Sequence, residues 1–124
     1  MTNTKKILVV EDEKTIRTTF VDAIGFEGFT IFGAKDGIEG LEVALKEHPD
    51  VILLDVLMPK MDGLQMLKKL RADEWGKKVP VIVLSNVAEK EEIAAAVESD
   101  VFDYFVKTDI KITDVIAKIR EKLK

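Results

Sequence analysis

Short apolar runs along the chain predict β-strands that are covered on both faces. Four runs are rich in branched aliphatic residues and do not alternate with polar ones: 7–10, 51–54, 79–84 and 102–106. A strand that is apolar at every position is typical of a parallel sheet lying between two layers of helices. A weaker run, residues 29–32, predicts a fifth strand nearer an edge of the sheet.

Between these runs, apolar residues recur at the spacing of an amphipathic helix. The sets are Ile16, Phe20, Ala23 and Ile24; Ile38, Leu41 and Leu45; Leu64, Leu67 and Leu70; and Ile112, Val115, Ile116, Ile119 and Leu123. Residues 91–99 also have a helical pattern, with a narrower apolar face. A strand followed by a helix, five times over, predicts an α/β fold with a doubly wound, five-stranded parallel sheet. In such sheets, ligand sites lie beyond the carboxyl ends of the strands.

Composition narrows the class of protein. A chain of 124 residues with 47% hydrophobic residues predicts one domain over residues 1–124, without an output domain. The longest apolar runs are far shorter than the roughly 20 residues that cross a bilayer, and no signal peptide is visible, so we expect a cytoplasmic protein. The net charge of −4, without a basic cluster, disfavours direct binding of nucleic acid.

The residues just past the strands suggest phosphoryl chemistry. They are Glu11 and Asp12, then Asp55, then Ser85, then Lys107. Three converging carboxylates repel one another unless a cation or a proton neutralises them, and Mg²⁺ prefers oxygen ligands. Asp55 could then act as the nucleophile, with Lys107 supplying positive charge and Ser85 a hydroxyl donor for phosphoryl oxygens.

Each of these residues also has a structural interpretation. Asp12 and Ser85 could cap a helix or shape a turn, and Lys107 could be a solvated strand end. Asp55 is harder to explain in this way, because it ends an apolar run where a charge without a partner is costly. The joint placement at one edge of the sheet favours a site.

The segment DVLMPKMDG, residues 55–63, resembles the phosphorylation loop of bacterial response-regulator receiver domains. Other matching positions follow the family's order and spacing: Glu11 and Asp12, residues 34–37, Ser85, Tyr104 and Lys107. The resemblance covers residues 6–123. It implies a flavodoxin-like (βα)5 fold with strand order 2-1-3-4-5.

The resemblance also implies roles for particular residues. Asp55 would accept a phosphoryl group, and Mg²⁺ would be held by Asp12, Asp55 and the backbone carbonyl of Leu57, with Glu11 binding through water. The phosphoryl donor would be a sensor histidine kinase or a phosphotransfer protein. Such a protein is a signalling receiver in a two-component system or phosphorelay, and it catalyses only its own phosphorylation and dephosphorylation.

Ser85 and Tyr104 resemble the family's switch pair, whose movement changes a protein-binding surface. The output would be contact with a downstream protein target, by a monomer or a phosphorylation-dependent dimer. The choice of kinase would depend on the loop after Val106 and on exposed residues of the first helix: Lys14, Thr15, Arg17 and Thr18.

Two departures from the family's pattern keep other functions open. Asn86 stands where a small residue is common, and Thr108 stands where proline commonly follows the lysine. They are the only support for a degenerate receiver that acts as an unphosphorylated interaction domain. An aspartyl-phosphate phosphohydrolase is disfavoured, because Leu57 occupies the place of its second aspartate. A nucleotide-binding domain is disfavoured by the absence of a Walker A or dinucleotide motif. His48, before Pro49, is predicted to cap a helix rather than bind metal.

Overall fold

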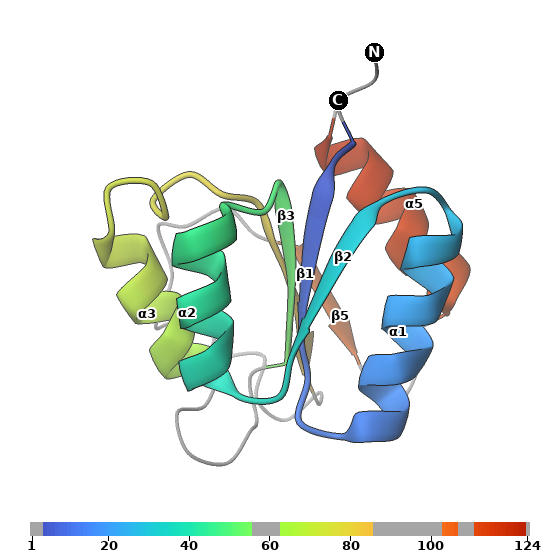
Figure 1. Cartoon of the computed structure of the whole chain (residues 1–124), viewed down its shortest axis with the longest axis horizontal. Helices are drawn as coiled ribbons and strands as arrows, with labels where there is room; N and C mark the ends of the chain where they lie inside the picture. The colour runs from blue at the N-terminus through green and yellow to red at the C-terminus, as the bar shows by residue number, and fades with distance from the viewer. Residues whose placement is uncertain (1–3, 56–62, 86–102, 107–110, 124) are drawn as a thin grey trace.

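A five-stranded parallel sheet forms the centre of the molecule (Figure 1). The computed structural model describes residues 4–55, 63–85, 103–106 and 111–123. The strands are β1 (Lys6–Val10), β2 (Thr30–Ala34), β3 (Val51–Asp55), β4 (Val81–Ser85) and β5 (Asp103–Val106). They lie in the order β2-β1-β3-β4-β5, which confirms the predicted flavodoxin-like order and places β2 at an edge.

Helices cover both faces of this sheet. They are α1 (Lys14–Phe26), α2 (Gly37–Glu47), α3 (Gly63–Ala72) and α5 (Ile112–Lys122). Helices α1 and α5 lie on one face and α2 and α3 on the other (Figure 1). The helix predicted over residues 91–99 lies outside the described residues. Among the helices described, none is long and apolar enough to span a bilayer.

The two faces of the strands pack into two separate core clusters. In β1, Leu8 and Val10 pack with α2 and α3, whereas Ile7 and Val9 pack with α1 and α5. Successive side chains of a strand point to opposite faces, so a strand with a core on each side must be apolar at every position. This is the physical reason for the unbroken apolar runs in the sequence.

Strand β4 begins two residues later than predicted. Pro80 has no backbone N–H and therefore cannot donate a hydrogen bond to a sheet ladder. The preceding carbonyl, that of Val79, accepts a hydrogen bond of 2.8 Å from the Arg71 guanidinium. The first two residues of the apolar run thus belong to the turn that leads into β4.

The apolar face predicted for α2 is confirmed only at Leu41, which packs against the core, and is wrong at Ile38 and Leu45. Ile38 and Leu45 are 47% and 39% exposed, whereas Gly37, Gly40 and Ala44 are buried. A Cβ on Gly40 would lie 2.9 Å from both Met66 Sδ and Val10 Cγ2, so the helix comes too close to its neighbours for a side chain at that position. Small residues permit this close approach, which leaves Ile38 and Leu45 exposed to solvent.

Candidate functional site

Three carboxylates meet at the carboxyl ends of β1 and β3. Val10 pairs with Leu54 in the parallel register, so Glu11 and Asp55 follow at the same level of the sheet. Carboxylate oxygens of Glu11, Asp12 and Asp55 lie within 4.8 Å of one another. Glu11 and Asp55 are fully buried, and Asp12 is exposed. The predicted convergence of these three residues is confirmed.

Backbone hydrogen bonds position the loop between β1 and α1. The Glu11 N–H donates to the carbonyl of Ala34 at the end of β2, at 3.0 Å. The Glu13 N–H donates to Glu11 Oε2, also at 3.0 Å, and Glu13 is the N-cap residue of α1. The Glu11 carboxylate is therefore oriented by the start of the helix.

This donor set fits a hard divalent cation. Two buried carboxylates so close together are electrostatically unfavourable, and a cation relieves their repulsion. Mg²⁺ takes oxygen ligands, typically one or two carboxylates, and keeps several waters. The exposed Asp12 provides a side of the cluster that solvent reaches, where those waters can lie.

The other predicted site residues are placed only in part. Ser85 ends β4 beside Val106 of β5, at the carboxyl edge of the sheet, and Asp55 pairs with Leu84. Tyr104 lies in β5 and pairs with Val83. Leu57 and Lys107 lie outside the described residues, as do Asn86 and Thr108. The roles of these residues stay predictions.

The matching segment over residues 34–37 has a structural role at the start of α2. Asp36 accepts a hydrogen bond of 2.9 Å from the Glu39 N–H, and Glu39 accepts one of 2.9 Å from the Lys35 N–H. These reciprocal bonds resemble a capping box, and the acidic pair at three-residue spacing is a signal that the sequence carries. The cap fixes the helix that follows β2.

Sequence patterns also misplaced one residue near the carboxylates. Arg17, predicted to be exposed with Lys14, Thr15 and Thr18, is half-buried, while the other three are exposed. Its guanidinium donates to the backbone carbonyl of Glu11 at 2.8 Å. Helical periodicity does not encode a bond from a side chain to a distant carbonyl.

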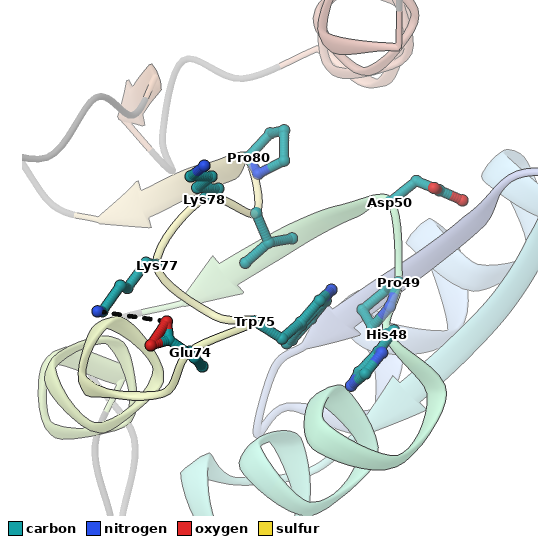
Figure 2. Close-up of a pocket in the computed structure, with 9 residues that line it drawn as sticks. His48, Pro49, Asp50, Glu74, Trp75, Lys77, Lys78 and Pro80 are labelled. Carbon is teal, nitrogen blue, oxygen red and sulfur yellow. Dashed lines mark hydrogen bonds and ion pairs between the residues drawn. The ribbon is translucent and has the colours of Figure 1, made fainter.

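A cavity lies at the opposite end of the sheet, where β3 and β4 begin (Figure 2). Its volume is about 600 Å³. It is lined by residues of the α2–β3 and α3–β4 connections: His48, Pro49, Asp50, Glu74, Trp75, Lys77, Lys78, Val79 and Pro80. Two lysines and two acidic residues balance in charge, and Lys77 contacts Glu74 at 3.5 Å. Like charges do not converge here.

His48 has the structural role that was predicted for it. It is the C-cap of α2 in the left-handed conformation, with φ 49° and ψ 62°. Its ring stacks on Trp75, with centroids 4.3 Å apart and an interplanar angle of 10°. The stack joins the end of α2 to the turn before β4 (Figure 2).

Comparison with known proteins identifies the family. The family model described as "Response regulator receiver domain" matches residues 7–120. The chain belongs to the response regulator receiver family. Receiver domains are signalling domains of two-component systems that interact with a histidine kinase or a phosphotransfer partner, and they bind Mg²⁺ at an acidic pocket.

Relatives and solved structures agree with this assignment. The chain is 33% identical over 119 residues to "Response regulator MprA" of Mycobacterium ulcerans (strain Agy99), covering 96% of this chain and 50% of that protein. It is 37% identical over 107 residues to "Regulatory protein AtoC" of Escherichia coli (strain K12), covering 86% of this receiver and 23% of that protein. The solved receiver domain of the Francisella response regulator 1452 has a TM-score of 0.84 at 30% identity, with 95% of each chain covered. The chain therefore spans half or less of these two curated relatives.

Proposed function

We propose that this receiver accepts a phosphoryl group on Asp55 from the phosphohistidine of a sensor histidine kinase or phosphotransfer protein. A bond forms between a carboxylate oxygen of Asp55 and phosphorus, and the bond from phosphorus to the histidine nitrogen breaks. The observation that carries the proposal is the burial of Asp55 beside Glu11 and Asp12, with carboxylate oxygens within 4.8 Å. An aspartate carboxylate is an established nucleophile for phosphoryl groups.

The residues around Asp55 would hold the metal and the phosphoryl oxygens. Asp12, Asp55 and the carbonyl of Leu57 would bind Mg²⁺, with Glu11 reaching it through water. When bound, Mg²⁺ neutralises the negative charge of the carboxylates and the phosphoryl group. The Ser85 hydroxyl would donate to one phosphoryl oxygen, and the Lys107 ammonium would supply a positive charge.

Phosphorylation would act as a switch in the cytoplasm. We propose that Ser85 moves towards the phosphoryl group, that Tyr104 fills the space it leaves, and that the altered surface binds a downstream protein. A local change in charge can shift an element between two packed arrangements in this way. The chain would catalyse its own phosphorylation and dephosphorylation, without turnover of another substrate, as a monomer or a phosphorylation-dependent dimer.

Intact-mass spectrometry after incubation with acetyl phosphate tests the proposal. A gain of one phosphoryl group with Mg²⁺, lost with EDTA and in Asp55→Asn, is the expected result. Asp36→Asn is a matched control, because Asp36 is also buried but caps α2, and asparagine caps equally well. No gain in a folded sample would overturn the proposal and favour an unphosphorylated interaction domain. Asn86 and Thr108 would then be the first residues to revert to the family's pattern.

A further inference from the structure

Arg17 of α1 contacts the loop that carries two of the three site carboxylates. Its Nη1 donates to the carbonyl oxygen of Glu11 at 2.8 Å, and the carbonyl oxygen of Asp12 lies 3.4 Å from the same nitrogen. Both bonds are made to backbone carbonyls and not to the carboxylates of Glu11 and Asp12. The Arg17 guanidinium therefore holds the backbone carbonyls of both Glu11 and Asp12.

The stem of Arg17 is fixed as well as its head. A Cβ on Gly33 would lie 3.5 Å from Arg17 Cδ and 3.6 Å from its Cγ, so the aliphatic stem packs over that residue of β2. The next residue, Ala34, accepts the hydrogen bond from the Glu11 N–H. The side chain thus passes from α1 across the edge strand to the loop after β1.

We propose that Arg17 is a positioning residue for the metal site, rather than part of the kinase-contact surface predicted for it. This inference rests on the function proposed above. Arg17 fixes the carbonyls of Glu11 and Asp12, which keeps the Glu11 carboxylate in reach of the Glu13 N–H and the Asp12 carboxylate beside Asp55. Residues that orient metal ligands in this way strongly affect metal affinity.

Electrostatics predicts the opposite effect and so makes the proposal testable. A positive charge beside the carboxylates repels Mg²⁺, and removing that charge alone strengthens metal binding. By contrast, loss of the hydrogen bonds that orient the loop weakens metal binding. The direction of the change in Mg²⁺ affinity therefore separates a positioning residue from a nearby charge.

The experiment compares Arg17→Met, Arg17→Lys and Lys14→Met by titration with Mg²⁺, followed by backbone amide NMR. Arg17→Met keeps most of the stem and should bind Mg²⁺ about tenfold more weakly than the unmodified chain. Arg17→Lys keeps the charge but lacks the planar fork, and should show a smaller loss. Lys14, exposed at the start of α1, controls for loss of charge and should give equal or tighter binding.

Amide hydrogen exchange provides a second measurement that does not need the metal. In Arg17→Met, the Glu13 N–H should exchange faster, because its acceptor on Glu11 is no longer held in place. The Ile24 N–H, in the same helix at a buried residue, should exchange as before and so exclude general destabilisation.

Two results would overturn the inference. Equal or tighter Mg²⁺ binding by Arg17→Met would show that Arg17 acts only through its charge. An unchanged exchange rate at Glu13 would show that it does not hold the loop. Failure of the unmodified chain to bind Mg²⁺ would instead overturn the proposed metal site, while the exchange measurement would still test the contact.

Discussion

The two ends of the sheet differ in how their charged side chains are arranged. At the amino end, a cavity of about 600 Å³ is lined by balanced charges and by a His48–Trp75 stack that joins two connections. At the carboxyl end, two fully buried carboxylates and an exposed one converge within 4.8 Å. In this receiver, the converging carboxylates at the carboxyl end are the arrangement that a divalent cation requires. The amino end stabilises the fold.

A substitution of Gly76, in the turn before β4 at the amino end of the sheet, should have the largest effect on stability. A Cβ there would lie 2.1 Å from the carbonyl oxygen of Leu70, so Gly76→Ala requires the backbone to move. We expect a loss of about 3 kcal/mol in the free energy of unfolding, measured with urea. Mg²⁺ affinity of the folded fraction should be unchanged.

Gly28→Ala is the control for this change. Gly28 has φ 99° and open space around it, so alanine there meets only backbone strain of about 1 kcal/mol. Equal losses at Gly76 and Gly28 would show that the contact with Leu70 is readily relieved. That result would weaken the assignment of the amino end as a rigid structural element.

The next largest effect should come from Mg²⁺ at the carboxyl end. A ligand that binds only the folded state at 100 times its Kd stabilises it by about 2.7 kcal/mol. We expect a stabilisation of this order for the unmodified chain, and none for Asp55→Asn. Without metal, Asp55→Asn should be the more stable of the two, because one of three clustered carboxylates is removed.

Thermal unfolding with Mg²⁺, with EDTA, and with Na⁺ at matched ionic strength measures these differences. Equal stabilisation of both chains by Mg²⁺ would mean that the ion binds elsewhere. The comparison between the two ends of the sheet would then no longer stand.

Gly40→Ala should affect both the packing of α2 and Mg²⁺ binding at the carboxylates. Its Cβ would press on Met66 Sδ and Val10 Cγ2 at 2.9 Å, and Val10 directly precedes Glu11. We expect a loss of about 2 kcal/mol in stability together with weaker Mg²⁺ binding, measured by urea unfolding and calorimetry. Leu45→Ala, on the exposed side of α2, should change neither. A destabilised Gly40→Ala chain with unchanged Mg²⁺ affinity would separate helix packing from the site.

Substitutions of His48 should have the smallest effect. Alanine there loses the ring stack and must adopt left-handed backbone, whereas glycine loses only the stack. We therefore expect His48→Ala to be about 1 kcal/mol less stable than His48→Gly in urea unfolding, with equal Mg²⁺ affinity. Equal stability of the two variants would show that backbone strain at this cap is negligible.

Much of the fold was predictable because burial on two faces leaves a direct pattern. Strand β1 is apolar at every position after Lys6, and β3 is apolar at every position before Asp55. Strand β2, with a weaker run, lies at the edge as predicted. The face of α2 was only partly predictable from large apolar residues, because Leu41 packs against the core as predicted but the fully buried positions are small, among them Gly40 and Ala44. Periodicity indicates which residues are apolar, but close approach of backbones depends on which residues are small.

The site was predictable to the extent that strand ends determine it. Glu11 and Asp12 follow β1, and Asp55 ends the neighbouring β3, so their convergence follows from the strand order. The contact of Arg17 with two carbonyls was not predictable, because a hydrophobic pattern does not distinguish one polar helix position from another. The residue types of a loop do not indicate where its backbone carbonyls point.

Trp75 gives this chain a spectroscopic property that follows from its position. It is the only tryptophan of the 124 residues, and it stacks on His48 at the end of the sheet opposite Asp55. Strand β3, five residues long, puts roughly 16 Å between the two ends. Tryptophan emission, excited at wavelengths that Tyr104 does not absorb, therefore monitors the amino end. A change in emission on phosphorylation would show that the structural change at Asp55 extends through the core to the opposite end of the sheet.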